Sequence, residues 1–199
     1  MAAAPVLVTS TKLHLGCGRD IREGWINLDC VEAPGIDVVA DLDSCGTQPL
    51  PFEDDSFDEV HASHLLEHIR NPLPLMQELH RVCRNGAVAH FRTPHGSHDD
   101  AFEDPTHYRQ YFENSYYFFS QPAYWRADYG YRGDWQPEEI VLCVDRTRYK
   151  DAGIEQLEWE VKHLRNVVLE MKATLRCVKP IREPRRELLT QAKMQIELV

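Results

Sequence analysis

The sequence predicts an α/β fold built on a mostly parallel sheet, followed by a helical segment. Three observations lead to this prediction. Short strand-like runs alternate with turns and helix-like segments, three successive strand ends carry glycine or an acidic residue, and the last fifty residues change to a helical repeat. Strands separated by crossovers form parallel sheets, so the carboxyl ends of the strands are the expected place for a ligand.

The expected elements follow from local periodicity. Residues 73–83 place apolar side chains at helical spacing, and Asn85-Gly86 forms a turn before the next apolar run. Strands are expected at 12–15, 25–29, 36–41, 57–62, 87–91 and 140–144.

Composition narrows the function classes. The 199 residues are 43% hydrophobic, enough for a core, and the net charge of −10 argues against nucleic acid as a partner. No apolar run is long enough to span a membrane, and the N-terminus lacks a basic leader. Six cysteines without CxxC spacing indicate a reducing compartment, so a cytoplasmic protein is expected.

The first three strand ends predict a nucleoside pocket. Gly16 and Gly18 follow the first strand, where glycine lets the backbone approach a ligand closely. Asp29 closes the second strand and can accept both hydroxyls of a ribose. Asp41 closes the third strand and, with the backbone of Leu42, can meet the amino edge of a purine.

Five sequence runs resemble the class I methyltransferases that use S-adenosylmethionine. They are LHLGCG (13–18), INLD (26–29), ADL (40–42), LPFEDDSFDEVHASHLLEHI (50–69) and NGAVAHFRTP (85–94). The resemblance covers about residues 12–145. It implies a Rossmann-like sheet of seven strands with one antiparallel strand near the edge, and S-adenosylmethionine as the cofactor.

The resemblance also assigns cofactor-binding residues. Gly16, Cys17 and Gly18 would face the methionine portion, Asp29 the ribose, Asp41 and Leu42 the adenine, and His61, Ser63 and His64 the transferred methyl group. One departure stands out, because only eleven positions separate Gly18 from Asp29, so residues 19–24 form little more than a turn. A group of small bacterial methyltransferases shares this shortened form. A dinucleotide-binding alternative needs a third glycine where Ile21 stands.

A loop after the strand at 87–91 carries the candidate catalytic residues. His95, His98, Asp104 and His107 can remove a proton from an acceptor hydroxyl. Two alternatives stay open. Histidine and carboxylate in this loop can hold a divalent metal, although no HxH or HExxH spacing supports one and no metal ligand is assigned. The same residues can also simply cap and hold the loop.

Two further regions bear on the acceptor. Residues 108–135 are dense in aromatic side chains, which suit either a wall of the acceptor site or a packed subdomain. Glu67 and His68 are expected to anchor a turn. The predicted reaction is base-assisted O-methylation of a small hydroxylated acceptor, such as a sugar or a natural-product intermediate.

The last segment predicts self-association. Residues 1–151 are expected to form the methyltransferase domain and residues 152–199 a helical segment. Within 154–178 apolar residues alternate at spacings of three and four, which favours a coiled coil and a homo-oligomer. The alternative function is an inactive methyltransferase-fold protein that binds a partner through this helix.

Overall fold

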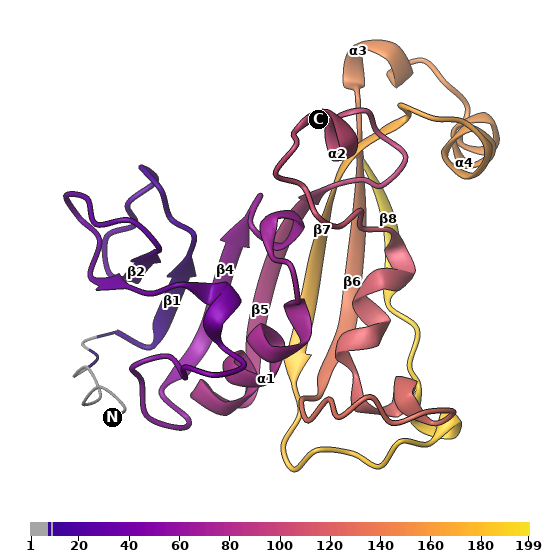
Figure 1. Cartoon of the computed structure of the whole chain (residues 1–199). Coiled ribbons are helices and arrows are strands. Elements are labelled where there is room, and N and C mark those ends of the chain that lie inside the picture. The colour runs from indigo at the N-terminus through magenta and orange to yellow at the C-terminus, as the bar shows by residue number, and fades with distance from the viewer. Residues whose placement is uncertain (1–7, 9) are drawn as a thin grey trace.

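A sheet of eight strands organises the molecule (Figure 1). The computed structural model describes residue 8 and residues 10–199. The strand order is β3-β2-β1-β4-β5-β7-β6-β8; only β7 runs against its neighbours. The strands are β1 (Lys12–Leu15), β2 (Ile26–Asp29), β3 (Val38–Val39), β4 (Phe57–Ser63), β5 (Cys83–Pro94), β6 (Trp135–Val144), β7 (Val168–Cys177) and β8 (Lys193–Leu198). The α/β class and the mostly parallel sheet are confirmed, with eight strands instead of seven.

Helices are short, apart from two. The α-helices are α1 (Pro72–Val82), α2 (Asp100–Glu103), α3 (Arg146–Tyr149) and α4 (Ile154–His163). The 3₁₀ turns are η1 (Leu42–Ser44), η2 (Leu66–His68), η3 (Glu113–Phe119), η4 (Gln121–Tyr124) and η5 (Arg186–Leu188). Pro72 suits the first turn of α1, and Leu75, Met76 and Leu79 are fully buried at helical spacing. The helix expected at 73–83 is therefore confirmed.

The two faces of the sheet differ in chemistry. On one face Val60, Ala89 and Leu175 lie in register across β4, β5 and β7, and all three are buried in the core. On the other face His61, His90 and Thr174 form the matching row and are only partly buried. Strand alternation therefore gives the sheet one apolar face and one polar face.

The connections near the cofactor end contain no helix. The chain passes from β1 to β2 and from β2 to β3 through turns, so the short connection expected at residues 19–24 is confirmed. Asn27 holds these turns, because its side-chain amide donates to the carbonyl of Arg22 and its backbone N–H donates to Asp37. A few polar contacts thus hold this short connection.

The expected helix over residues 154–178 is wrong in its second half. Helix α4 ends at His163, and β7 lies between β5 and β6 in the middle of the sheet. Residues 152–199 also supply β8, so they share one sheet with residues 12–144. A coiled coil through 154–178 therefore has no structural basis.

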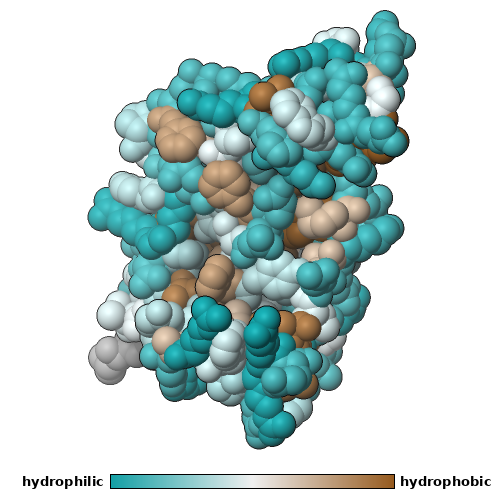
Figure 2. Space-filling model, turned by 90° about the vertical axis from the view of Figure 1, so that its right-hand side faces the viewer, coloured by the Kyte–Doolittle hydropathy of each residue, from teal (hydrophilic) through white to brown (hydrophobic). Residues whose placement is uncertain are grey.

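The right-hand side of the molecule, seen in Figure 2, is largely hydrophilic and carries its apolar side chains in small, separate patches.

The error has a physical cause. From Glu170 to Cys177 polar and apolar residues alternate strictly, which is the period of a half-buried strand. Three residues of the heptad seam, Val168, Met171 and Leu175, are also fully buried in that strand. The two periods overlap over this stretch, and sheet pairing decides between them.

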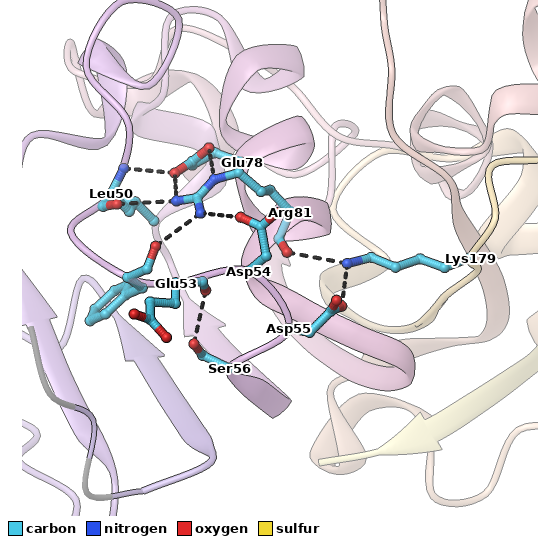
Figure 3. A network of polar contacts seen from close by, with 9 residues as sticks. Leu50, Glu53, Asp54, Asp55, Ser56, Glu78, Arg81 and Lys179 are labelled. Carbon is cyan, nitrogen blue, oxygen red and sulfur yellow. Dashed lines mark hydrogen bonds and ion pairs between the residues drawn. The ribbon is translucent and has the colours of Figure 1, made fainter. Parts of the chain in front are cut away.

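A network of charged groups holds the amino ends of β4 and β5 together (Figure 3). Arg81, near the end of α1, donates to the backbone carbonyls of Leu50 and Phe52 and forms ion pairs with Asp54 and Glu78. Glu78 in turn accepts from the backbone N–H of Leu50. The LPFEDDSFD run of the sequence thus serves to attach its loop to α1.

Another short polar bridge extends this network. The ammonium group of Lys179, beyond β7, pairs with Asp55 and donates a hydrogen bond to the carbonyl of Arg81.

In the part of the chain that the structure describes, no helix is both long and apolar enough to cross a membrane.

Candidate functional site

Gly18 and Asp29 meet at the carboxyl ends of β1 and β2. The backbone N–H of Gly18 donates to Asp29 Oδ2 at 2.8 Å, and that of Val31 donates to Oδ1 at 3.2 Å. Partial burial opposes ionisation of Asp29, but these backbone hydrogen bonds outweigh it and lower its pKa. An ionised, oriented carboxylate with free lone pairs suits two ribose hydroxyls.

The glycine turn itself requires glycine. Gly16 and Gly18 have φ values of 57° and 52°, in the left-handed region. A Cβ on Gly16 would stand 2.8 Å from Leu65 Cδ1, whereas a Cβ on Gly18 would meet nothing within 4 Å. Between them Cys17 is buried, and its N–H donates to the carbonyl of Leu28. The side chain of Leu65, which comes after β4, therefore lies next to Gly16 at this turn.

Asp41 lies beside Asp29 at the end of the neighbouring strand. The N–H of Ala40 donates to the carbonyl of Asp29 at 3.0 Å. Asp41 also begins η1, and its Oδ1 accepts from the N–H of Asp43. Leu42 is buried below it. The structure thus brings the three predicted strand ends together at one edge of the sheet.

His61 lies farther down β4 and contacts the β1–β2 turn. Its Nε2 is 3.2 Å from the guanidinium of Arg22, and its ring packs edge-on against His14 and Trp25. Burial and then the charge of Arg22 lower the pKa of His61 to about 4, so it is neutral at pH 7. Ser63, two residues on, is the last residue of β4 and pairs with Arg92 of β5.

His64 lies between two carboxylates just beyond β4. Its Nε2 is 3.4 Å from Glu170 and its Nδ1 is 3.3 Å from Glu67. The carboxylates of Glu170 and Glu67 raise the pKa of His64 to about 9, so it is charged at neutral pH. Burial opposes ionisation of Glu170, but contacts with His64 and Arg92 outweigh it and lower its pKa to about 2.

A cavity of about 350 Å³ opens at this end of the sheet. It lies where β4 and β5 end and antiparallel β7 begins. Its lining residues are His64, Arg92, Pro94, Asp100, His107, Leu169, Glu170 and Val199. Charged groups of both signs and an imidazole converge there, which suits a small polar molecule.

Three of the four predicted catalytic residues lie away from the cavity beside His64 and make other contacts. His95 is buried, with Nδ1 2.7 Å from Ser97 Oγ. His98 Nδ1 accepts from the N–H of Asp100. Asp104 accepts from both the N–H and the hydroxyl of Thr106, and these bonds lower its pKa. None of the three lines the cavity of His64.

The fourth residue, His107, lies at the cavity and beside two residues of η2. Ligand-type atoms of Glu67, His68 and His107 all lie within 4.8 Å of one another. The rings of His68 and His107 are 4.7 Å apart between centroids and close to perpendicular. The N–H of Tyr108 donates to the carbonyl of Glu67 at 2.8 Å and attaches the loop to η2.

Aromatic residues form a second cavity, of about 600 Å³, next to the start of α1. Tyr108, Phe112, Phe118 and Tyr129 line it and are exposed. Other aromatic residues of this region, such as Trp135, are fully buried. The expected packed subdomain is therefore present, whereas the exposed aromatic residues line a cavity other than the one beside His64.

Sequence reasoning missed Arg92 and Glu170 and assigned Glu67 only to a turn. Glu170 faces the site because it lies near the start of β7, and the alternation from 170 to 177 was the available signal. Arg92 and Glu170 form a bidentate pair across β5 and β7, 78 residues apart. Such a pair depends on strand register, which no local pattern reports.

Comparisons with known proteins agree with this geometry. Residues 13–91 match the family model described as a methyltransferase domain. A SAM-dependent methyltransferase from Archaeoglobus fulgidus is 16% identical, with a TM-score of 0.55 over 84% of this chain and 86% of that one. No curated protein sequence matches the chain.

Two further solved structures show how widely this fold is used. Phosphoethanolamine N-methyltransferase 2 of Haemonchus contortus, in complex with S-adenosyl-L-methionine, is 14% identical, with a TM-score of 0.50 over 88% of this chain and 50% of that one. The [4+2]-cyclase SpnF is 17% identical, with a TM-score of 0.52 over 87% and 78%. Likeness at this identity shows the fold and leaves the acceptor open.

Proposed function

We propose that this chain, a class I S-adenosylmethionine-dependent methyltransferase by its domain match and its fold, methylates a hydroxyl group of a small polar acceptor. The observation that carries the proposal is the position of two adjoining sites. The cofactor residues Gly16 and Asp29 lie at the ends of β1 and β2, and the polar cavity lies at the ends of β4 and β5. Leu65 lies between them, because its side chain would stand 2.8 Å from a Cβ on Gly16 and it directly follows His64.

The residues present fit the cofactor. The ionised carboxylate of Asp29 is oriented by Gly18, and the left-handed glycines leave room for close approach of a ligand. The cofactor supplies a methyl group on a positively charged sulfur. The protein must therefore position the acceptor and remove its proton, while the methyl carbon exchanges its bond to sulfur for one to oxygen and the electron pair stays on sulfur.

The cavity supplies groups for both tasks. Hydrogen-bond donors and acceptors for neighbouring hydroxyls come from the Arg92–Glu170 ion pair. His64, which lies between two carboxylates, adds to them. A sugar or a hydroxylated natural-product intermediate has such hydroxyls. His107 is the predicted catalytic residue that lines the cavity, and we assign activation of the hydroxyl to it.

Calorimetry with S-adenosylhomocysteine tests the cofactor site. The wild-type protein should bind it, and Asp29→Ala should weaken binding at least tenfold. Asp20→Ala is the matched control, because Asp20 is an exposed acid on the same turn and should leave the affinity unchanged. Equal affinities for all three proteins would contradict this role of Asp29.

Methyl transfer from labelled cofactor tests the acceptor class. We expect product with polyhydroxylated acceptors and none with matched amines, and loss of product in His107→Asn at unchanged S-adenosylhomocysteine affinity. Product formed only on the amines would overturn the hydroxyl assignment and leave the cofactor site standing.

A further inference from the structure

We propose that Glu67, His68 and His107 form a binding site for one divalent transition-metal ion of the zinc type. The three side chains come from two separate segments, η2 and the loop between α2 and η3, and their ligand atoms lie within 4.8 Å of one another. Ligands bonded to one tetrahedral zinc ion at about 2.0–2.2 Å stand about 3.3–3.6 Å apart. The ligand atoms would therefore have to approach one another by at most about 1.5 Å to bind one ion.

Unpartnered buried atoms point to a ligand. The side chain of Glu67 is 2% exposed and that of His107 is 9% exposed. Neither carboxylate oxygen of Glu67 and not the Nδ1 of His107 has a hydrogen-bond partner. His64 Nδ1 lies 3.3 Å from Glu67 Oε1, which is an ion-pair distance, but the two atoms do not form a hydrogen bond. Buried polar atoms are normally paired, and a metal ion would satisfy both residues together.

The hydrogen bonds around His68 leave its other nitrogen free for a metal. Thr106 Oγ1 donates its proton to Asp104 at 2.6 Å, so it can only accept from His68 Nδ1, 2.9 Å away. The proton of a neutral His68 is therefore on Nδ1, and Nε2 keeps a lone pair. Metal-binding histidines are oriented in this way, through a second nitrogen bonded to a carboxylate or its relay.

The donor set selects the ion and its chemistry. Two imidazoles and one carboxylate suit Zn²⁺ and its first-row neighbours and disfavour Mg²⁺. Three protein ligands leave the fourth position open, as catalytic zinc sites do. The inference deepens the proposed function: an acceptor hydroxyl at the open position would release its proton to solvent water, and its oxygen would then take the methyl group. His107 then activates the hydroxyl as a metal ligand.

Zinc titration of chelator-treated protein tests the site directly. Calorimetry should show one saturable Zn²⁺ per chain, with affinity lowered at least tenfold in His68→Asn and in His107→Asn. Thr106→Val, which keeps all three ligands, should weaken binding about 10–100-fold. His163→Asn, on exposed α4, is the control and should bind as the wild type does. Mg²⁺ should give no saturable binding.

Two results would overturn the inference. One is the absence of saturable Zn²⁺ binding, and the other is equal affinity in the wild type and both histidine variants, which would assign the zinc to other surface histidines. S-adenosylhomocysteine binding, measured on the same samples, reports that each variant is folded. It also separates the two proposals, because loss of zinc binding with intact S-adenosylhomocysteine binding leaves the methyltransferase assignment standing.

Discussion

The two ends of the central strands differ in how their buried charged groups are paired. At the amino ends, Arg81 donates to two carbonyls and two carboxylates, and both carboxylate oxygens of Glu78 accept hydrogen bonds (Figure 3). At the carboxyl ends, Glu67 and His107 keep buried atoms without partners. A satisfied network contributes to stability, whereas unsatisfied groups cost stability and are kept where a ligand will complete them.

This contrast separates two sequence runs next to β4. The LPFEDDSFD run (50–58) holds four acidic residues and includes the start of β4, whereas the LLEHI run (65–69) follows β4 and holds Glu67 beside His68. Only the second one faces the cavity end of the sheet, because strand direction places them at opposite edges. Substitutions at the two ends should therefore separate stability from activity.

The largest effect is expected at the amino ends. Arg81→Ala leaves the carboxylate of Glu78 buried without its cation, so the free energy of unfolding should fall by about 3 kcal/mol. Urea denaturation measures it. Arg84→Ala is the matched control, because its pair with Asp58 is exposed and its loss should change stability by about 0.5 kcal/mol or less. Similar losses in both variants would contradict a special role for the network.

The next effect lies at the glycine turn. Gly16→Ala forces a left-handed alanine against Leu65, and we expect a loss of about 2–3 kcal/mol in unfolding free energy. Gly18→Ala has the same backbone strain without the contact and should lose about 1 kcal/mol. Thermal or urea unfolding compares the pair. An equal loss would show that the contact with Leu65 adds nothing.

The change expected at the carboxyl ends is smaller. Glu67→Gln should alter the free energy of unfolding by about 1 kcal/mol or less, because a neutral amide costs less to bury than a carboxylate without hydrogen-bond donors but loses the ion pair with charged His64. Methyl transfer should be lost in the same variant. A destabilisation as large as that of Arg81→Ala would instead make Glu67 part of the structural framework.

At neutral pH the smallest effect is expected at His61, because its influence on stability appears only in acid. The pKa of His61 is about 4 in the folded protein and about 6.5 when unfolded, so the unfolded state binds more protons between these values. Its contribution is fully present above pH 6.5 and is lost as pH falls toward 4. His61→Gln should therefore flatten the fall in stability over this window, leaving a residual slope from His14, whose pKa is also lowered. An unchanged slope would contradict the assignment.

The sequence predicted the features that depend on neighbouring residues. The helix at α1 followed from the spacing of Leu75, Met76 and Leu79, and the meeting of Gly18 with Asp29 followed from the order of strand ends. Features that depend on pairing between distant segments were not predictable in this way. The Arg92–Glu170 pair needs the register of β5 and β7, and His68 meets His107 across a turn and a loop.

The coiled-coil prediction failed for the same reason. Met171 and Leu175 fit a helical repeat and a strand repeat equally well, whereas Val168 fits only the helical one, and the open edges of β5 and β6 select the strand. Of the predicted catalytic residues, His107 lines the cavity, whereas His95 is buried in the interior. A single loop thus supplies both a packing residue and a site residue, and composition does not separate them.

The place of β7 has a consequence for biosynthesis. A strand made late from the chain lies between two strands made earlier, so β5 and β6 have no shared partner until residues 168–177 leave the ribosome. Until then β5 has one unpaired edge and β6, whose other partner β8 also comes later in the chain, has two. Such edges are the kind of surface that captures other chains. A protein cut after residue 151 should accordingly fail to close its sheet, and translation speed through the final fifty codons sets how long that vulnerable state lasts.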